Sequence, residues 1–443
     1  MTADTIVSLA SGAVPAGVAV IRLSGTDAFA IANRVSSLQV DKQDHASARL
    51  VTLHDDKTLL PLDKALRLIF RSPHSFTGED VVEFHVHGGL VLIAELLELL
   101  QRCGARQSRG GEFSERAFLN GKIDLSQAEG VSDLIAATSR ESRLLATRQL
   151  SGELFNVITE IENQLQTARV LLEASIDFPE DVGDVNVTDL LRHLNAANRS
   201  LNTLMETERR GTLLRSGATV AIVGRPNVGK SSLLNTLVGQ NRAIVSSIPG
   251  TTRDTIESFV LINGIQIRFI DTAGMRETQD EIEALGVARS VVAVQQADLL
   301  ISLFTADIDP VELPAGASEQ PKMVVKNKVD LYPESTREES ILHISTVTGE
   351  GISSLLDGIS FHLNGGTQVN ETCHVAINAR HAIYTRLALD AVQRAMDMSN
   401  LPGSPELVAV DIHDASLHLA CITGRNVIDS LHSEVFAKFC IGK

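Results

Sequence analysis

The fold of this chain is decided by the stretch Gly224-Arg225-Pro226-Asn227-Val228-Gly229-Lys230-Ser231. It follows the apolar run 220–223 and precedes the apolar segment 233–237, so the sequence predicts a strand, a tight loop and a helix in that order. Glycines in such a loop let backbone N–H groups surround a phosphate, and the N-terminus of the helix adds positive potential. A chance glycine turn before a helix is the alternative, which the surrounding strand and helix disfavour. The stretch therefore predicts a P-loop of the pattern GxxxxGK[ST].

Two side chains of this loop carry the nucleotide chemistry. Lys230 can reach the β- and γ-phosphates of a bound nucleotide, and the Ser231 hydroxyl can bind Mg²⁺. The loop and the first turn of the helix supply the following predicted nucleotide contacts: Asn227, Val228, Gly229, Lys230, Ser231 and Ser232.

A second nucleotide motif, Asp271-Thr272-Ala273-Gly274, follows the predicted strand 267–270. Asp271 can hold the Mg²⁺ shell through water, and the Gly274 N–H can sense the γ-phosphate. This DxxG pattern is a weak signal alone, but it gains weight from its position after a strand downstream of the P-loop.

Two further motifs follow later strands and point to the base. Asn327-Lys328-Val329-Asp330 follows the strand 323–325, and the Asp330 carboxylate can accept hydrogen bonds from both the N1–H and the 2-amino group of guanine. Adenine offers neither pattern, so this residue selects GTP over ATP. Ser345-Thr346-Val347 can add backbone contacts to the base. In this order the four motifs predict a GTPase domain.

The segment Ile248-Pro249-Gly250-Thr251-Thr252-Arg253-Asp254 lies between the P-loop and Asp271. A polar loop is the plain interpretation, and a switch in which Thr252 completes the Mg²⁺ coordination is the functional one, favoured by its position between predicted strands. Its predicted GTP contacts are Ser246, Ser247, Ile248, Pro249, Gly250, Thr251 and Thr252.

Hydrolysis needs a group that orients water and a cation that neutralises transition-state charge. Met275 stands where many small GTPases carry Gln, and it cannot orient water. Asn227 offers a side-chain carbonyl beside the phosphates. With backbone carbonyls of Ser246, Ile248 and Thr251 it can cage a monovalent ion such as K⁺. Bracing of the loop by Asn227 is an equally compatible interpretation.

Composition restricts the function classes. The 443 residues carry 39 Lys and Arg against 55 Asp and Glu, a net charge of −16, so phosphate backbones are repelled on average. The 4 cysteines form no CxxC pair, which disfavours a zinc ribbon. The N-terminal segment lacks the basic residues of a secretory signal, which predicts a cytoplasmic protein. No apolar run is long enough to predict a membrane span.

Apolar spacing divides the chain into four predicted segments. Residues 1–120 mix short strands and helices, 121–215 are helical, 216–366 form a parallel sheet with crossover helices, and 367–443 are helical again. The α/β segment is thus inserted between helical ones. We interpret 211–217 as a linker because glycines bracket it. One apolar helix face is predicted from Leu154, Ile158, Ile161, Leu165, Ala168 and Leu172, and another from Ile383, Leu387, Ala391 and Met396.

Over its whole length the chain resembles the MnmE (TrmE) family of tRNA-modification GTPases. The resemblance rests on GRPNVGKSSLLN, IPGTTRDT, DTAGMR and NKVD, on the N-terminal stretches 75–89 and 110–130, and on the terminal motif CIGK. One motif departs from the family pattern: the base-contacting segment Ser345-Thr346-Val347 reads STV, where SAK or SAR is usual.

This resemblance implies a Ras-like G domain inserted in a helical domain, preceded by an α+β, aminomethyltransferase-like domain that binds folate and forms a homodimer. It implies that K⁺, held by Asn227, Ser246, Ile248 and Thr251, drives dimerisation of the G domains. Mg²⁺ maps onto Ser231 and Thr252. Catalytic roles map onto Lys230, Gly274 and Glu283, the last orienting water. Taken alone, Glu283 reads as a solvated helix charge. Folate contacts map onto Arg22, Glu83, Lys122 and Lys443, although surface charge is the simpler interpretation of Arg22 and Lys122 taken alone.

The implied reaction adds an aminomethyl or carboxymethylaminomethyl group to C5 of the wobble uridine of certain tRNAs. The one-carbon donor is 5-formyl- or 5,10-methylene-tetrahydrofolate, and FAD resides on a partner, MnmG, in a heterotetramer. The acidic net charge implies that this partner supplies most of the tRNA-binding surface. Cys440 within the final motif is either a nucleophile or a packing residue.

Two other functions remain open. A regulatory GTPase of ribosome assembly would share the G domain and bind rRNA, but it would have no use for a folate site. A folate aminomethyltransferase gated by the G domain would transfer the one-carbon unit without a flavin partner.

Overall fold

The computed structural model divides the chain into two compact units, Met1–Ser132 with Leu417–Lys443 and Asp133–Ser416. The residues that the structure describes are 4–12, 15–41, 44–183, 185–240, 259–271, 295–310, 320–332, 340–366, 375–399, 405–425, 435, 436, 439 and 442.

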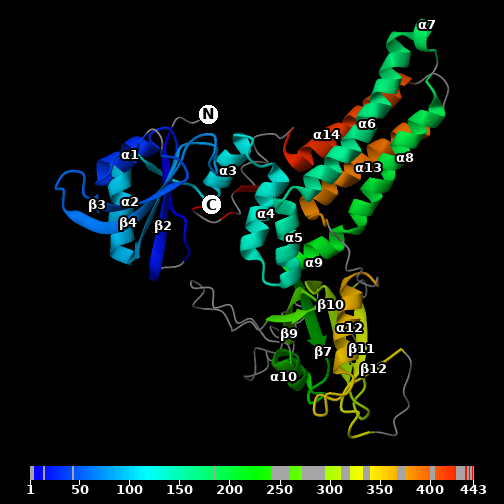
Figure 1. The fold of residues 1–443 in the computed structure, drawn as a ribbon. Coiled ribbons are helices and arrows are strands. Elements are labelled where there is room, and N and C mark those ends of the chain that lie inside the picture. The colour runs from blue at the N-terminus through cyan, green and yellow to red at the C-terminus, as the bar shows by residue number, and fades with distance from the viewer. Residues whose placement is uncertain are drawn as a thin grey trace, which may run out of the picture. The chain divides into compact units, whose positions relative to one another are not determined.

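The first unit contains a six-stranded sheet in the order β3-β4-β5-β2-β1-β6 (Figure 1). β6 runs parallel to β1, and the other neighbouring strands are antiparallel. The strands are β1 (Ile6–Leu9), β2 (Ala16–Ser24), β3 (Ser47–His54), β4 (Pro61–Phe70), β5 (Val81–Gly88) and β6 (Arg106–Gln107).

The two faces of this sheet differ in character because side chains alternate along each strand. One face is apolar, with Val7, Leu23 and Phe84 fully buried in a core shared with α1 (Ala28–Val35) and α2 (Leu90–Arg102). The other face carries Arg22, whose guanidinium carbon lies 5.7 Å from the ring centre of Phe113 on α3 (Glu112–Leu119). The polar face is therefore where a ligand site can form.

The end of the chain belongs to this first unit. Val435, Phe436 and Phe439 form a buried cluster with Leu125 and Ala128 of α4 (Leu125–Ala136). These three residues are thereby packed against α4 within the first unit.

The second unit contains a six-stranded sheet in the order β12-β11-β10-β7-β9-β8. β8 pairs with β9 in antiparallel fashion, and the remaining pairs are parallel. The predicted parallel sheet is confirmed, with β8 as an additional antiparallel edge, and this is a Ras-like arrangement. Its elements are β7 (Ala218–Val223), α10 (Lys230–Gln240), β8 (Phe259–Ile262), β9 (Ile265–Asp271), β10 (Leu299–Phe304), β11 (Lys322–Lys326), β12 (Leu342–His343) and α12 (Ile352–Leu363).

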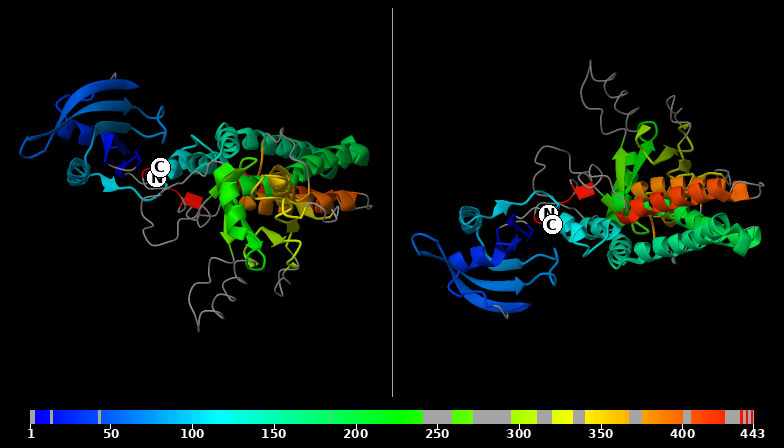
Figure 2. Two further views of the ribbon diagram at one scale, coloured as in Figure 1. Left: turned by 90° about the horizontal axis from the view of Figure 1, so that it is seen from below. Right: turned by 90° about the horizontal axis from the view of Figure 1, so that it is seen from above.

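A bundle of long helices accompanies this sheet in the second unit, and α6, α8 and α13 lie side by side in it (Figures 1 and 2). The predicted apolar face of 154–172 is confirmed, since all six of its residues are buried. The helices are α5 (Arg140–Leu150), α6 (Glu153–Asp177), α7 (Pro179–Val182), α8 (Val187–Glu206), α9 (Glu208–Ser216), α13 (Ala379–Ser399) and α14 (Pro405–Thr423), of which α14 passes into the first unit at Leu417. Among the described residues, no helix is both long and apolar enough to cross a membrane.

The prediction of a linker over 211–217 is wrong, because residues 208–216 form the helix α9. Gly211 lies against the Ile377 carbonyl, where an added Cβ would come within 2.3 Å of the oxygen. The glycine thus permits close packing of a helix and does not signal a flexible connection.

The apolar face predicted for α13 is only partly its buried face. Ala391 of that face is fully buried and Met396 is half-buried, whereas Ile383 and Leu387 are 60% and 40% exposed. The buried face continues instead through Ala388 and Ala395. Small side chains let α13 approach α8 closely, so the helix buries alanines and leaves larger residues outside.

Candidate functional site

The P-loop connects the end of β7 to the start of α10. Lys230 is 5% exposed, and its ammonium donates hydrogen bonds to the carbonyls of Gly224 at 2.8 Å and Arg225 at 3.0 Å. Asn227 adopts a left-handed backbone with φ of +65°, which asparagine tolerates better than most residues. The loop therefore folds around the lysine ammonium, and Asn227 is exposed at its outer turn.

Asn327 joins three of the predicted motifs. Its side-chain amide donates to the Val228 carbonyl at 2.9 Å, and its oxygen accepts the N–H of Thr346 at 3.3 Å. It is 1% exposed. Gly229 lies so close that a Cβ there would come within 2.4 Å of the Asn327 amide nitrogen, so this position requires glycine. The P-loop and the base-recognition loops are thus one connected site.

The Asp330 carboxylate is held by a neighbouring hydroxyl. Ser345 donates to an oxygen of Asp330 at 2.6 Å, while its own oxygen accepts the N–H groups of Val347 at 3.3 Å and Thr348 at 3.1 Å. Asp330 itself is exposed, so its carboxylate is accessible to a base. The sequence predicted only backbone contacts for 345–347, and it missed the positioning role of the Ser345 side chain.

The remaining predicted nucleotide contacts are only partly described. The backbone of Asp271 ends β9 opposite Ile222 of β7, at the sheet edge from which the P-loop leaves. Ser231 and Ser232 are exposed in the first turn of α10, Lys328 has a left-handed φ of +62°, and Val329 is buried. The predicted residues that lie outside the described part are Ser246, Ser247, Ile248, Pro249, Gly250, Thr251, Thr252, Thr272, Ala273, Gly274 and Glu283.

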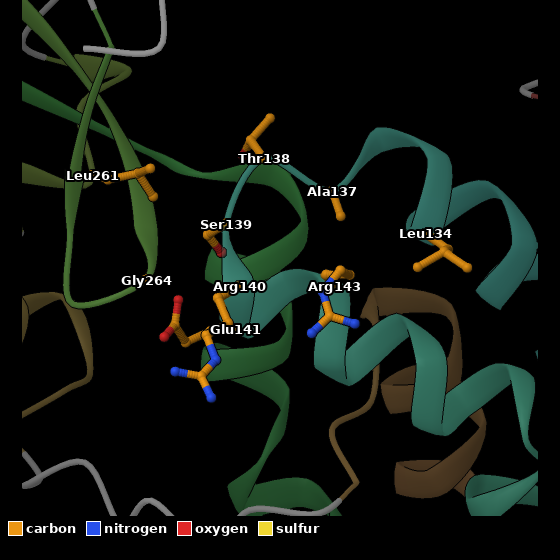
Figure 3. A pocket seen from close by; sticks show the side chains of 9 residues that line it. All are labelled: Leu134, Ala137, Thr138, Ser139, Arg140, Glu141, Arg143, Leu261 and Gly264. Carbon is orange, nitrogen blue, oxygen red and sulfur yellow. The ribbon is translucent and has the colours of Figure 1, made fainter. Parts of the chain in front are cut away.

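A cavity of about 620 Å³ lies elsewhere in the second unit, between the start of α5 and the turn joining β8 to β9 (Figure 3). Glu141 extends toward that turn, where a Cβ added to Gly264 would come within 2.6 Å of its side chain. The residues that line the cavity include Ser139, Arg140 and Arg143, and none of the predicted nucleotide contacts that the structure describes. The cavity is therefore separate from the described part of the nucleotide site.

In the first unit, two of the predicted folate residues meet directly. Arg22 on β2 and Glu83 on β5 are register partners, and the Arg22 Nε donates to the Glu83 carboxylate at 2.7 Å. Both side chains are mostly buried, at 21% and 14% exposure. Phe76 and Phe113 lie on Arg22 at 5.9 and 5.7 Å, as cation–π contacts. Sequence reasoning assigned no role to either aromatic residue.

The other two predicted folate residues lie in different positions. The Lys122 ammonium donates to the Pro73 carbonyl at 2.9 Å, and its stem contacts Gly78, so it lies on the loop that carries Phe76. Lys443 is outside the described residues, and Cys440 is too. Gly442, which precedes Lys443, lies against the Leu9 carbonyl at the end of β1. Gly442 thus lies beside β1, the strand that pairs with β2 and its Arg22.

A buried ionic network fixes α3 beside this site. Arg116, 6% exposed, pairs with Glu112 at 3.2 Å, Glu79 at 3.2 Å and Asp4 at 2.8 Å, and Arg106 pairs with Glu112 at 2.6 Å. Burial alone would raise the pKa of Glu112. Hydrogen bonds from Arg106, the Arg109 backbone and Arg116 outweigh burial and hold the pKa below its ordinary value. Glu112 is therefore charged and satisfied in the folded state.

Taken together, the sheet order, the P-loop and the contacts of Asn327 and Asp330 define a GTPase domain that the chain inserts between helices of a bundle. Comparison with known proteins agrees with this class. The family profile described as MnmE helical domain matches residues 125–440, and the one described as GTP-binding protein TrmE N-terminus matches residues 5–122.

Two relatives match the chain over nearly its whole length. The tRNA modification GTPase MnmE of Acetivibrio thermocellus is 38% identical over 99% of this chain and 99% of that protein. The protein of the same name from Thiobacillus denitrificans is 40% identical over 99% of this chain and 98% of that protein. The chain belongs to the MnmE family of tRNA modification GTPases.

Proposed function

We propose that this GTPase works in the modification of tRNA, at C5 of the wobble uridine, with a tetrahydrofolate derivative as the one-carbon donor. The observation that carries the proposal is the coexistence of two sites in one chain. One is the joined P-loop and base-recognition site around Asn327, and the other is the Arg22–Glu83 pair under Phe76 and Phe113.

For the nucleotide site we propose the roles that the motifs predict. Asp330, positioned by Ser345, accepts the guanine N–H groups, and Lys230 contacts the phosphates when a nucleotide replaces its present carbonyl partners. Mg²⁺ is assigned to Ser231 and Thr252. The exposed Ser231 hydroxyl at the start of α10 fits this ion, because Mg²⁺ prefers oxygen ligands.

For potassium we propose a site built by Asn227 with Ser246, Ile248 and Thr251. Support comes from the exposed position and left-handed backbone of Asn227 at the outer turn of the P-loop. The ion supplies positive charge to the phosphates, and Glu283 is the proposed water-orienting residue. Exchange of K⁺ for Na⁺ at constant ionic strength should sharply reduce GTP turnover, and equal rates in the two salts would refute the assignment.

For the folate site the chemistry of the donor set supports the assignment. A carboxylate such as Glu83 can accept hydrogen bonds from the amino and N–H groups of a pterin, while aromatic rings offer faces for stacking. Lys122, together with Lys443, would pair with the acidic glutamate tail. The pterin supplies the one-carbon unit when bound, and the residues of this chain hold and orient it.

We further propose the assembly and location that the family resemblance implies. The chain forms a homodimer through its first domain, joins the FAD-carrying MnmG in a heterotetramer in the cytoplasm, and leaves most tRNA contacts to that partner because its own net charge is −16. The domain division remains 1–120, 121–215, 216–366 and 367–443. GTP hydrolysis would drive the G domains together and apart.

The nucleoside profile of tRNA tests this function. Cells that lack the protein should lose the modified wobble uridine, and the wild-type gene should restore it, whereas Asp330→Asn should not. A ribosome-assembly GTPase would instead leave the profile intact and alter ribosome profiles. Modified tRNA formed by the purified protein without the flavin partner would favour the aminomethyltransferase alternative.

A further inference from the structure

Two buried hydroxyl groups next to the Arg22–Glu83 pair have no hydrogen-bond partner. Ser8 on β1 is 0% exposed and Ser108, directly after β6, is 5% exposed, and the side-chain oxygen of each is unpaired. A buried hydroxyl without a partner destabilises the protein, so such groups need an explanation, and a missing ligand is a common one.

The strand register places these hydroxyls in one row with the proposed folate residues. Ser8 is the direct partner of Arg22, and Arg22 is the direct partner of Glu83. Ser108 donates its N–H to the Val7 carbonyl, which continues the parallel β1–β6 pairing and puts Ser108 beside Ser8. Residues in register share a face of the sheet. Glu83, Arg22 and Ser8 therefore form a row across β5, β2 and β1 on the polar face, and Ser108, directly after β6, extends it.

The spacing of this row matches an elongated ligand. Neighbouring strands lie about 4.8 Å apart, so Ser8 is about 10 Å from Glu83. This is comparable to the length of a pterin ring with its one-carbon substituent. If the amino edge of the pterin binds Glu83, the opposite end of the pterin lies near Ser8. Gly442 lies against Leu9, the residue next to Ser8.

We propose that the hydroxyls of Ser8 and Ser108 bind the one-carbon end of the folate and favour a formyl over an unsubstituted nitrogen. A formyl oxygen has two lone pairs and can accept a hydrogen bond from each hydroxyl, whereas a ring amine without the formyl group has a single lone pair. This inference rests on the folate site proposed above, and it names the residues that sense whether the folate carries a formyl group.

The test measures binding of 5-formyl-tetrahydrofolate and of tetrahydrofolate to the full-length protein by calorimetry. Ser8→Ala and Ser108→Ala should each weaken binding of the formyl compound about 3- to 10-fold, the effect of one hydrogen bond, and leave tetrahydrofolate binding within twofold. Both variants should melt at or above the wild-type temperature, because each removes an unpaired buried hydroxyl.

Ser47→Ala is the matched control. Its hydroxyl is also buried without a partner, but its register partner Ile69 pairs with Val82, which places Ser47 on the opposite, apolar face. It should change neither affinity. Unchanged affinity of Ser8→Ala for the formyl compound, or equal losses for both compounds, would overturn the inference while leaving the folate site. If the wild-type protein binds neither compound, the folate site itself is wrong and this inference falls with it.

Discussion

Replacing Arg215 with alanine should loosen the helices that surround α9. The Arg215 side chain is 10% exposed, and it donates to the Asp133 carboxylate at 2.7 Å, the Gln149 side-chain oxygen at 2.6 Å and the Ala376 carbonyl at 2.9 Å. Removing one member of a buried ion pair costs about 3–5 kcal/mol. Asp133 is 25% exposed, so water compensates part of this loss, and we expect the free energy of local opening to fall by about 2–3 kcal/mol.

Hydrogen–deuterium exchange with peptide resolution measures this quantity, because amides in α5 and α9 exchange through local opening. A fall of about 2–3 kcal/mol corresponds to exchange about 30- to 150-fold faster. Global melting is less informative, since a chain with two units need not unfold in one step. Arg215→Lys keeps the charge but loses the planar fork, so its exchange should be intermediate.

Arg140→Ala provides the matched control for this experiment. Arg140 is an exposed arginine at the start of α5, so its loss should change local stability by less than about 0.5 kcal/mol. If Arg215→Ala accelerated exchange in α5 and α9 no more than Arg140→Ala does, the contacts of Arg215 would not stabilise these helices, and the reasoning would be refuted.

Two other predictions concern the base and the buried ionic network. Asp330→Asn should weaken GTP binding about 10²- to 10⁴-fold, because two hydrogen bonds lose a charged acceptor, and it should favour xanthosine triphosphate, whose base carries a carbonyl in place of the amino group. Ser345→Ala should weaken GTP binding about tenfold, because the hydroxyl that positions Asp330 is lost. Unchanged GTP affinity of both variants in titrations would exclude both roles. The pKa of Glu112 in the folded state lies below its ordinary value of 4.5. The stability that Glu112 contributes is therefore complete above pH 4.5, and it is lost as the pH falls through the folded-state pKa. Glu112→Gln should cost about 3 kcal/mol at neutral pH and flatten the acid dependence of near-ultraviolet circular dichroism, and an acid transition identical to the wild type would contradict the assignment.

The elements that the sequence predicted well are those with a strong local pattern. β7, the P-loop and α10 follow from glycines and apolar runs within a short stretch, and the buried face of α6 follows from its regular spacing. The β3–β4 hairpin was not predicted, because β3 exposes Leu50 and β4 exposes Leu66, which blurs the alternation of buried and exposed residues.

The site was less predictable because its contacts depend on pairing between distant segments. Arg22 and Glu83 are 61 positions apart, and they meet only in the observed register of β2 and β5. A slip of one residue would put them on opposite faces of the sheet. The roles of Phe113 and of the Ser345 hydroxyl likewise arise from packing of loops and helices, which leaves no local signal in the sequence.

Helix α9 holds the G domain at both of its connections to the bundle. Its last residue, Ser216, is followed directly by β7, which leads to the P-loop. At its other end, Arg209 donates to the carbonyls of Leu363 at 2.5 Å and His362 at 3.2 Å, at the C-terminus of α12. A cation at a helix C-terminus is favoured by both hydrogen bonding and the helix dipole. A rotation of the sheet against the bundle would therefore bend α9 or break these contacts, and it would also change the contact between Glu141 of α5 and the β8–β9 turn.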